Sequence, residues 1–433
     1  MKDESIFSLS RRNFFKASFL SSLSFITKSY ATTISKPIKD KDKLSIVYYA
    51  KSQETNRLVD ILFEKLGGIQ RIIDNNDIVL IKPNSQWWNQ GATNTDILYS
   101  FIRKVLSLKN FKGEIVIADN HQTKNPNSRG WTTTQRSGTF NLNELVHYFN
   151  ENGYANVTKY HWHDAGPNPA PLQGDASGNI VVKHPSEGDG YVWPRDLYYE
   201  DPFGHRTILS YPIFTSTYSG VTIDLKNGAF YKGKYTNQPV KFINFPSLNH
   251  HGEYAGMTGA VKNLMGVVDM SCGWPAPFPE GYYNVHHIGA TKLFQILSRL
   301  PLKDKIPKIK KVLKSPSIFR FHYTGGVLGK FMSQVRKPDL NIMTAIRVGW
   351  GSRTDVKKAV KKDTIVASTD PLALDYWSAK NILLPVTKEA NAPNKFMLLN
   401  NPDRKDGPLY RFLSEANKEF EGSIKEENIK AVL

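Results

Sequence analysis

The chain has 433 residues, of which 40% are hydrophobic and 12% aromatic, so it is long and apolar enough to bury a large core. It carries 57 Lys and Arg against 39 Asp and Glu, a net charge of +18, and a single cysteine, Cys272. One cysteine excludes an internal disulfide, and it also excludes an iron–sulfur cluster held by four cysteines of the same chain.

The N-terminal segment is typical of an export signal. In "SRRNFFK", Arg11 and Arg12 precede the short apolar stretch "ASFLSSLSFI", and Ala31 then supplies a small residue at a plausible cleavage position. This order resembles the twin-arginine signal, whose translocase accepts folded proteins. We therefore expect residues 1–31 to direct export to the periplasm through the twin-arginine translocase, with an uncleaved signal anchor as the alternative. No later apolar run has the length of a membrane span, so we expect a soluble mature protein.

After a polar tether at 32–43, strand-like and helix-like segments alternate. The expected strands are 44–50, 77–84 and 113–120. The expected helices are 56–68, 95–109 and 141–153. Gly67 and Gly68 are expected to end the first helix, and Thr95 to cap the second. This alternation predicts an α/β fold with a parallel or mixed sheet flanked by helices.

Two stretches interrupt the alternation. Residues 160–235 are rich in Gly, Pro, Asn, Tyr and Trp, and their short alternating runs predict an irregular β-rich insertion. The α/β rhythm returns at 239–247 and is interrupted again at 303–337, which holds ten basic residues and one acidic residue. We expect residues 44–433 to form one large α/β domain that contains both insertions.

The basic segment 303–337 indicates an anionic partner. Anionic lipid, an acidic glycan or a phosphorylated substrate fits this charge in an exported protein, and we expect no nucleic acid. The alternative is a solvated basic face that serves only solubility.

Several polar residues directly follow the expected strands, where ligands bind in open parallel sheets. They are Lys82, Asn84, Asp119, Asn120, His121, Asn249, His250, His251 and Asp370. The alternative for Asn84 and Asp119 is a turn hydrogen bond. For Asp370, which precedes Pro371, we favour a helix N-cap over catalysis.

The stretch "GMTGAVKNLMGVVDMS" is the most informative part of the chain. From Thr258 onward it predicts a helix with one polar face that carries Lys262, Gly266 and Asp269, at positions i, i+4 and i+7. The apolar face would carry Val261, Leu264, Met265 and Val268. Gly266 would allow a ligand or another backbone to approach closely. We favour a lysine that contacts an anionic group, with a buried Lys262–Asp269 pair as the alternative.

Four stretches resemble the domain-of-unknown-function family 362, over roughly 77–380. They are "DIVLIKPN", "EIVIADN", "INFPSLNHHGEYAGMTGAVKNLMG" and "DLNIMTAI…IVASTDPLALD". The resemblance implies an α/β outline similar to the nickel-pincer lactate racemases, which is an analogy of fold and no indication of nickel. Family members often carry twin-arginine signals, and some add cysteine-rich ferredoxin modules whose cysteines this chain lacks. Where the family has Lys-x-His, this chain has Asn249-His250-His251.

Histidine and tryptophan add weaker signals. Of the histidine pairs, His250 and His251 best fit a metal site, because they follow an expected sheet strand. For His286 and His287 we favour a partly exposed helix start. The loop tryptophans suit stacking on sugar rings, or simply the packing of an irregular insertion. They are Trp87, Trp88, Trp131, Trp162 and Trp193.

Two functions follow from these observations. The first is a metal- or cofactor-dependent enzyme that acts on an anionic small molecule or glycan in the periplasm. Lys262 would bind the anion with support from Lys82, and His250 or His251 would be a metal ligand or general acid/base. The supporting polar groups would be Asn84, Asp119, Asn120, His121, Asn263, Asp269, Asp370 and Asp375. The second function is a non-catalytic binding or assembly factor that uses segment 303–337 on a membrane or a partner.

Overall fold

The structure of the protein is a computed structural model, which describes residues 44–120, 134–162, 181–270, 281–286, 288–289, 291–301, 303–313 and 320–433. The expected export signal, the tether and His121 lie outside the described residues. Residues 44–433 form one compact unit of the chain.

A mixed sheet organises this unit, and it confirms the predicted α/β class. Within the described ranges it has ten strands, in the order β17-β1-β16-β15-β12-β2-β3-β4, with β13 and β14 attached beside β15. Strands β15, β12, β2, β3 and β4 run parallel to one another, whereas β16 is antiparallel to both of its neighbours. The strands are β1 (Ser45–Lys51), β2 (Ile78–Pro83), β3 (Glu114–Asp119), β4 (Val157–His161), β12 (Val240–Phe245), β13 (Ser247–Gly252), β14 (Gly256–Thr258), β15 (Leu340–Gly349), β16 (Ala359–Ser368) and β17 (Ile429–Val432).

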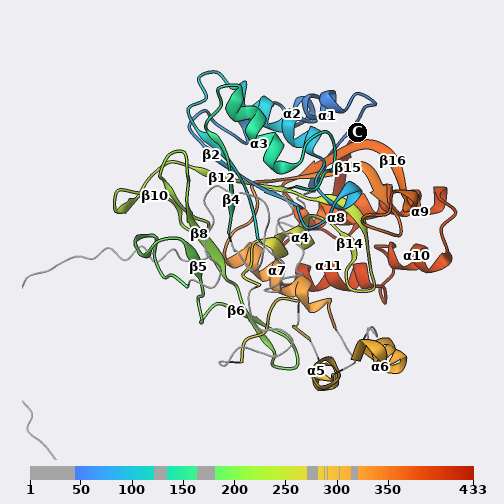
Figure 1. The fold of residues 1–433 in the computed structure, drawn as a ribbon. Helices are drawn as coiled ribbons and strands as arrows, with labels where there is room; N and C mark the ends of the chain where they lie inside the picture. The colour runs from blue at the N-terminus through green and yellow to red at the C-terminus, as the bar shows by residue number, and fades with distance from the viewer. Residues whose placement is uncertain are drawn as a thin grey trace, which may run out of the picture. The chain divides into compact units, whose positions relative to one another are not determined.

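Helices cover both faces of the sheet, as expected for parallel strands joined by crossovers. On one face lie α1 (Leu58–Leu66), α2 (Thr95–Leu106) and α3 (Leu142–Glu151), grouped in Figure 1 above the sheet. Every residue of β2 and β3 is buried as a result. The further helices are α4 (Ala260–Asn263), α5 (Lys292–Arg299), α6 (Pro307–Leu313), α7 (Tyr323–Gln334), α8 (Pro371–Ser378), α9 (Leu384–Glu389), α10 (Asn394–Leu399) and α11 (Pro408–Glu419).

The three helices on the first face begin and end close to the predicted positions. Helix α1 ends at Gly67, whose φ of 81° is the left-handed conformation that glycine adopts without steric cost. Helix α3 begins with a capping box formed by Asn141 and Glu144. The predicted cap of α2 is wrong by one residue. The side chain of Asn94 accepts the hydrogen bonds from the first turn, and Thr95 is already the first helical residue.

The β-rich insertion is confirmed as a set of small antiparallel sheets. In the described part of the chain, five strands form the sheet β11-β10-β9-β8-β5, and β6 pairs with β7. This region packs against the main sheet, because the ring of Phe214 lies 4.7 Å from that of Tyr160 at the end of β4. Its strands are β5 (Gly190–Val192), β6 (Tyr198–Glu200), β7 (Arg206–Ile208), β8 (Tyr211–Thr215), β9 (Thr222–Asp224), β10 (Gly228–Tyr231) and β11 (Lys234–Tyr235).

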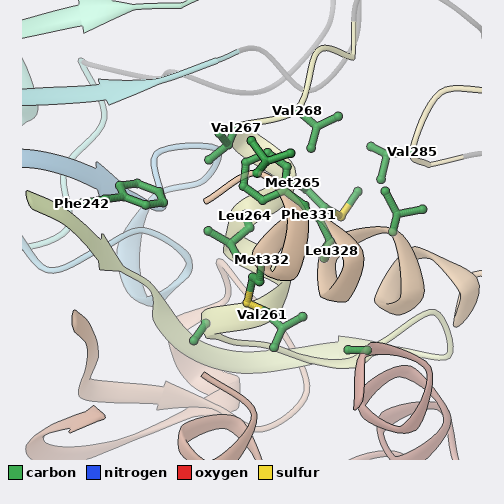
Figure 2. Packing of buried hydrophobic residues seen from close by; sticks show 14 of the residues in the cluster. Phe242, Val261, Leu264, Met265, Val267, Val268, Val285, Leu328, Phe331 and Met332 are labelled. Carbon is green, nitrogen blue, oxygen red and sulfur yellow. The ribbon is translucent and has the colours of Figure 1, made fainter. Parts of the chain in front are cut away.

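The basic segment 303–337 does not form one surface in its described part. Its second half is α7, a core helix that packs against α11. A Cβ at Gly325 or Gly329 would clash with the α11 backbone, so these glycines allow close helix contact. Figure 2 shows Leu328 and Phe331 of α7 packed against hydrophobic residues around α4. Helix α6 and the turn before it lie at the surface.

The C-terminal end of the chain belongs to the main sheet. After α11, strand β17 pairs in parallel with β1 at the edge of the sheet. No helix in the described part of the chain is long and apolar enough to span a membrane.

Candidate functional site

A pocket opens at the carboxyl ends of β2 and β3, beneath the turn that carries α4. About 430 Å³ of space that protein atoms do not fill, open solvent included, lies between its lining residues. We call it the lysine pocket, because two buried lysines line it. Its lining residues are Lys82, Asn84, Gln86, Trp87, Asp119, Asn120, His251, Thr258, Lys262, Asn263, Met265, Gly266 and Met270.

The floor of the lysine pocket is a buried ion pair. Lys82 Nζ lies 3.0 Å from Asp119 Oδ1, and both side chains are almost wholly inaccessible to solvent. Lys82 also donates to the Pro83 carbonyl (2.7 Å), and Asp119 accepts from Ser85 Oγ (2.7 Å). Burial lowers the pKa of Lys82 and raises that of Asp119, while the attraction between the opposite charges and their hydrogen bond counteracts both shifts. The pair is therefore held together by its geometry and is neutral in net charge.

Gly266 lies directly over this pair. A Cβ at this position would collide with Asp119 Oδ1 and lie 2.6 Å from Lys82 Nζ. The short 3-10 turn Leu264–Gly266 can therefore approach the ion pair only because residue 266 has no side chain. The sequence predicted that a ligand or another backbone would approach Gly266 closely. In the structure, the groups that approach it are the side chains of Lys82 and Asp119.

Buried amides connect the floor to the centre of the sheet. Asn263 accepts from Lys82 Nζ (3.0 Å) and donates to Asn244 Oδ1 (2.8 Å). Asn244 in turn donates to Asn341 Oδ1 (2.8 Å), which connects β12 to β15. This chain of hydrogen bonds fixes the orientation of Asn263 and, through it, of Lys82.

Lys262 is the second buried lysine, and its surroundings differ from those of Lys82. Its side chain is only 6% exposed. Among the described residues no hydrogen bond or ion pair to its ammonium group is found. Burial, with smaller contributions from Arg353 and Lys82, lowers the pKa of Lys262 from 10.5 to about 7.

A buried carboxylate positions the turn that carries Lys262. Asp375 accepts hydrogen bonds from the backbone N–H groups of Ala260 (2.6 Å) and Val261 (3.0 Å), at the start of α4. Burial raises the pKa of Asp375 to about 7. A Cβ at Gly259 would collide with this carboxylate. Asp375 thus fixes the first turn of α4 by hydrogen bonds, and it is not among the residues that line the lysine pocket.

The helix expected from Thr258 onward is much shorter in the structure. Helix α4 covers only Ala260–Asn263 and continues as the 3-10 turn. Lys262 and Asp269 consequently do not share a helix face, and both the expected common face and the alternative Lys262–Asp269 pair are wrong. Asp269 accepts a hydrogen bond from Trp193 Nε1 (2.9 Å) in the β-rich insertion. Lys262 and Gly266 do line the same pocket.

His251 and Trp87 also line the pocket, and Arg353 contacts both of them. The Arg353 guanidinium stacks over the Trp87 ring at 4.1 Å and lies 3.2 Å from His251 Nδ1. Burial and the neighbouring cations, with Lys262 first among them, hold the pKa of His251 well below its ordinary value, so the ring is neutral. The same guanidinium nitrogen lies 3.4 Å from Nε2, so arginine, which can only donate, reaches both ring nitrogens of His251. The hydroxyl of Thr258 completes the contact, 3.0 Å from Nδ1.

His250 does not share this environment. Adjacent residues of β13 point to opposite sides of the strand. His250 Nδ1 lies 2.6 Å from Asn400 Oδ1, and its ring packs edge-on against Phe396. In the described ranges no group of three His, Cys, Asp or Glu is placed to hold a metal ion. Because His251 faces Arg353 and Lys262, these residues do not fit a divalent cation, and no step of the proposed chemistry uses a metal.

The remaining predicted residues fall into two groups. Asn84, Asn120 and Asn263 line the lysine pocket. Asp370 is the N-cap of α8, as favoured, and accepts from Leu372 N (2.9 Å) and Ala373 N (3.1 Å).

Two residues near Lys262 were missed as site residues. Arg353 lies in the connection from β15 to β16, and no motif in the sequence marks it. His286, expected as a partly exposed helix start, is half-buried in a turn, and burial and Lys262 lower its pKa to about 3. Only the tertiary structure brings these residues close to Lys262.

Comparison with known proteins agrees with the resemblance found in the sequence. Residues 235–380 match the model of a family described as Domain of unknown function (DUF362). The comparisons with curated proteins and with solved structures found no significant match. The matched segment contains β12 to β16 and supplies Lys262, His251 and Arg353, whereas Lys82 and Asp119 come from the chain before it. Over residues 235–380, about a third of its length, the chain is thus similar to the DUF362 family.

Proposed function

We propose that the protein is an enzyme that binds a small anionic molecule in the lysine pocket and transfers a proton to or from it through Lys262. The observation that carries this proposal is a buried amine that lines a pocket and has no partner among the described residues. Burying an unpaired ammonium group costs free energy, so a ligand that supplies the missing partner explains its position.

The charges around the pocket favour an anion. Asp119 is the one carboxylate among the lining residues, and Lys82 already neutralises it. Lys262 and the adjacent Arg353 leave an excess of positive charge. Asn84, Gln86 and Thr258 offer amide and hydroxyl groups, which suit the hydroxyls of a sugar acid or hydroxy acid.

The lowered pKa of Lys262 favours proton transfer over simple charge pairing. A group with a pKa of about 7 is present in both protonation states near neutral pH, which is the condition for an efficient general acid/base. His251 is neutral and is held by Arg353 and Thr258, so it offers the substrate a neutral imidazole rather than a second titrating group. The proton therefore moves at Lys262 Nζ, while Arg353 balances the negative charge of the substrate.

The place of action belongs to this proposal as well. The twin-arginine motif at Arg11 and Arg12 supports export to the periplasm. There, sugar acids and the acidic units of glycans are available anions.

A binding screen tests the proposal. Lactate, gluconate and glucuronate are added to the purified protein at pH 6.5, and the melting temperature is measured. We expect at least one anion to stabilise the wild type and a Lys405→Met variant, whose lysine is exposed, but not a Lys262→Met variant. Failure of every anion, or equal stabilisation of the Lys262→Met variant, would overturn the proposal.

The catalytic part has a separate readout. The stabilising anion is incubated with the protein in deuterated water, and incorporation of deuterium at carbon is followed by mass spectrometry. Exchange in the wild type that is lost in Lys262→Met supports proton transfer. If the anion binds but incorporates no deuterium, the protein only binds anions, and the proposed enzymatic activity is refuted.

A further inference from the structure

Helices α5 and α6 form a surface that neither the sheet nor the lysine pocket uses. They pack against each other and lie at the lower edge of the view in Figure 1, beyond α7. Together with the turn between them they span residues 292–313. We call this the α5–α6 surface.

Helix α5 has two apolar stripes where a surface helix needs one. Phe294 and Leu297 face inward and belong to the main hydrophobic core or pack against it. Leu293 and Ile296 are 53% and 61% exposed, and Leu300 continues their line one turn later. Positions i, i+3 and i+7 lie on one side of a helix, so this second stripe is continuous and faces solvent.

The exposed stripe is extended by α6 and its preceding turn. Ile306 and Val312 are about two-fifths exposed. Single exposed apolar residues are common on proteins, but a cluster of five on two adjacent helices indicates an interaction surface. Nothing in the described part of the chain covers it.

The charge of the same surface is strongly positive. Residues 292–313 contain seven Lys and Arg and one Asp. Lys292 and Lys305 are exposed beside the apolar stripe, and α6 adds exposed lysines at 308, 310 and 311. Lysines beside large apolar side chains on a short amphipathic helix are typical of segments that lie in the interface of an anionic bilayer.

We propose that the α5–α6 surface docks the protein on an anionic lipid bilayer. Leu293, Ile296 and Leu300 would enter the boundary between headgroups and acyl chains, and the lysines would contact the lipid phosphates. Charge complementarity selects lipid over an apolar protein groove, because a partner protein would need a matching acidic rim. Docking is independent of the chemistry in the lysine pocket, and either can fail without the other.

Vesicle sedimentation tests this docking. The full chain is incubated with vesicles of phosphatidylcholine that contain 30% phosphatidylglycerol, at 50 and at 300 mM salt. Binding is expected at low salt and is expected to weaken at least tenfold at high salt, since ion screening shortens the range of the lysine charges. Vesicles of phosphatidylcholine alone should bind weakly.

Two sets of variants locate the contact. Leu293→Ser with Ile296→Ser should weaken binding at least tenfold. Replacing the lysines at 308, 310 and 311 by Gln should weaken it roughly 100-fold. Leu398→Ser, which removes a 41% exposed leucine on α10, and Lys405→Gln serve as matched controls and should bind like the wild type.

Because residues 1–43 are present in every variant, any lipid contact of their own is the same throughout. Unchanged binding after the α5 and α6 substitutions would overturn the proposal, as would the absence of binding to anionic vesicles. A protein partner recovered on this surface together with a negative vesicle result would also overturn it.

Discussion

Two buried lysines line the same pocket and are kept there in different ways. At the ends of β2 and β3, Lys82 lies 3.0 Å from a carboxylate and makes further hydrogen bonds. On α4, Lys262 has cations as its charged neighbours and a pKa lowered to about 7. The first lysine is part of the structure, and the second is available to a ligand. The comparison teaches that burial alone does not mark a lysine as a candidate functional group, whereas burial without a partner does.

The largest expected change in the free energy of unfolding comes from breaking the Lys82–Asp119 ion pair. Asp119→Ala leaves Lys82 as an uncompensated buried charge and should cost about 3–5 kcal/mol in the free energy of unfolding, measured with urea. Asp60→Ala breaks the exposed pair with Lys104 (2.6 Å) and should cost at most about 1 kcal/mol. Equal losses for the two variants would show that the Lys82–Asp119 pair is not buried as described.

Removing the unpaired lysine, Lys262, is expected to change the free energy of unfolding in the opposite direction. Lys262→Met should stabilise the unliganded protein by roughly 1–4 kcal/mol at pH 6, because it removes a charge that folding must desolvate. The folded pKa of about 7 is below the ordinary 10.5, so the folded state releases the proton first as the pH rises, and the wild type regains stability between those values. The gain in melting temperature should therefore be larger at pH 6 than at pH 9.5. A gain that does not depend on pH would contradict the lowered pKa.

Gly266→Ala tests how closely the backbone at residue 266 approaches the Lys82–Asp119 ion pair. The added methyl group meets the Asp119 carboxylate and the Lys82 amine, and it should cost about 1–3 kcal/mol in unfolding free energy. In an Asp119→Ala background part of this cost should disappear, because the obstructing carboxylate is gone. Strict additivity in this double-mutant cycle would place the two residues apart.

The smallest effect concerns the binding of an anion. Lys262 is protonated below about pH 7, so the affinity for the anion should fall as the pH rises above that value, by at most tenfold per unit. His251 and His286 have pKa values well below this range and should not contribute. Isothermal titration from pH 6 to 9 measures the trend. A dissociation constant that is level over this range would assign anion binding to Arg353 alone.

Much of the fold could be predicted because the determining signals are local. The buried runs of β2 and β3, the apolar stripe of α2 and the glycines after α1 depend only on residues close in the chain. The rule that ligands bind beyond the carboxyl ends of parallel strands identified Lys82 and Asp119 as neighbours of a site. The same rule could not separate an ion pair from a ligand-binding group.

The missed features depend on contacts between distant segments. The expected long helix after Thr258 gives way to a 3-10 turn after Asn263, where the Lys82 and Asp119 side chains approach Gly266. The two histidines of β13 diverge, since neighbouring side chains of a strand point apart, and only His251 reaches the pocket. The basic segment divides into a core helix and an exposed one, which its charge alone does not reveal.

By itself the sequence determined the α/β alternation, the glycine that ends α1 and the aspartate that caps α8, because periodicity and capping act over a few residues. The tertiary structure decided which lysine is paired, where Arg353 lies and which apolar side chains of α5 remain exposed. These properties are set by burial and by distances between segments far apart in the chain, and the electrostatic free energy of a buried charge depends on those distances.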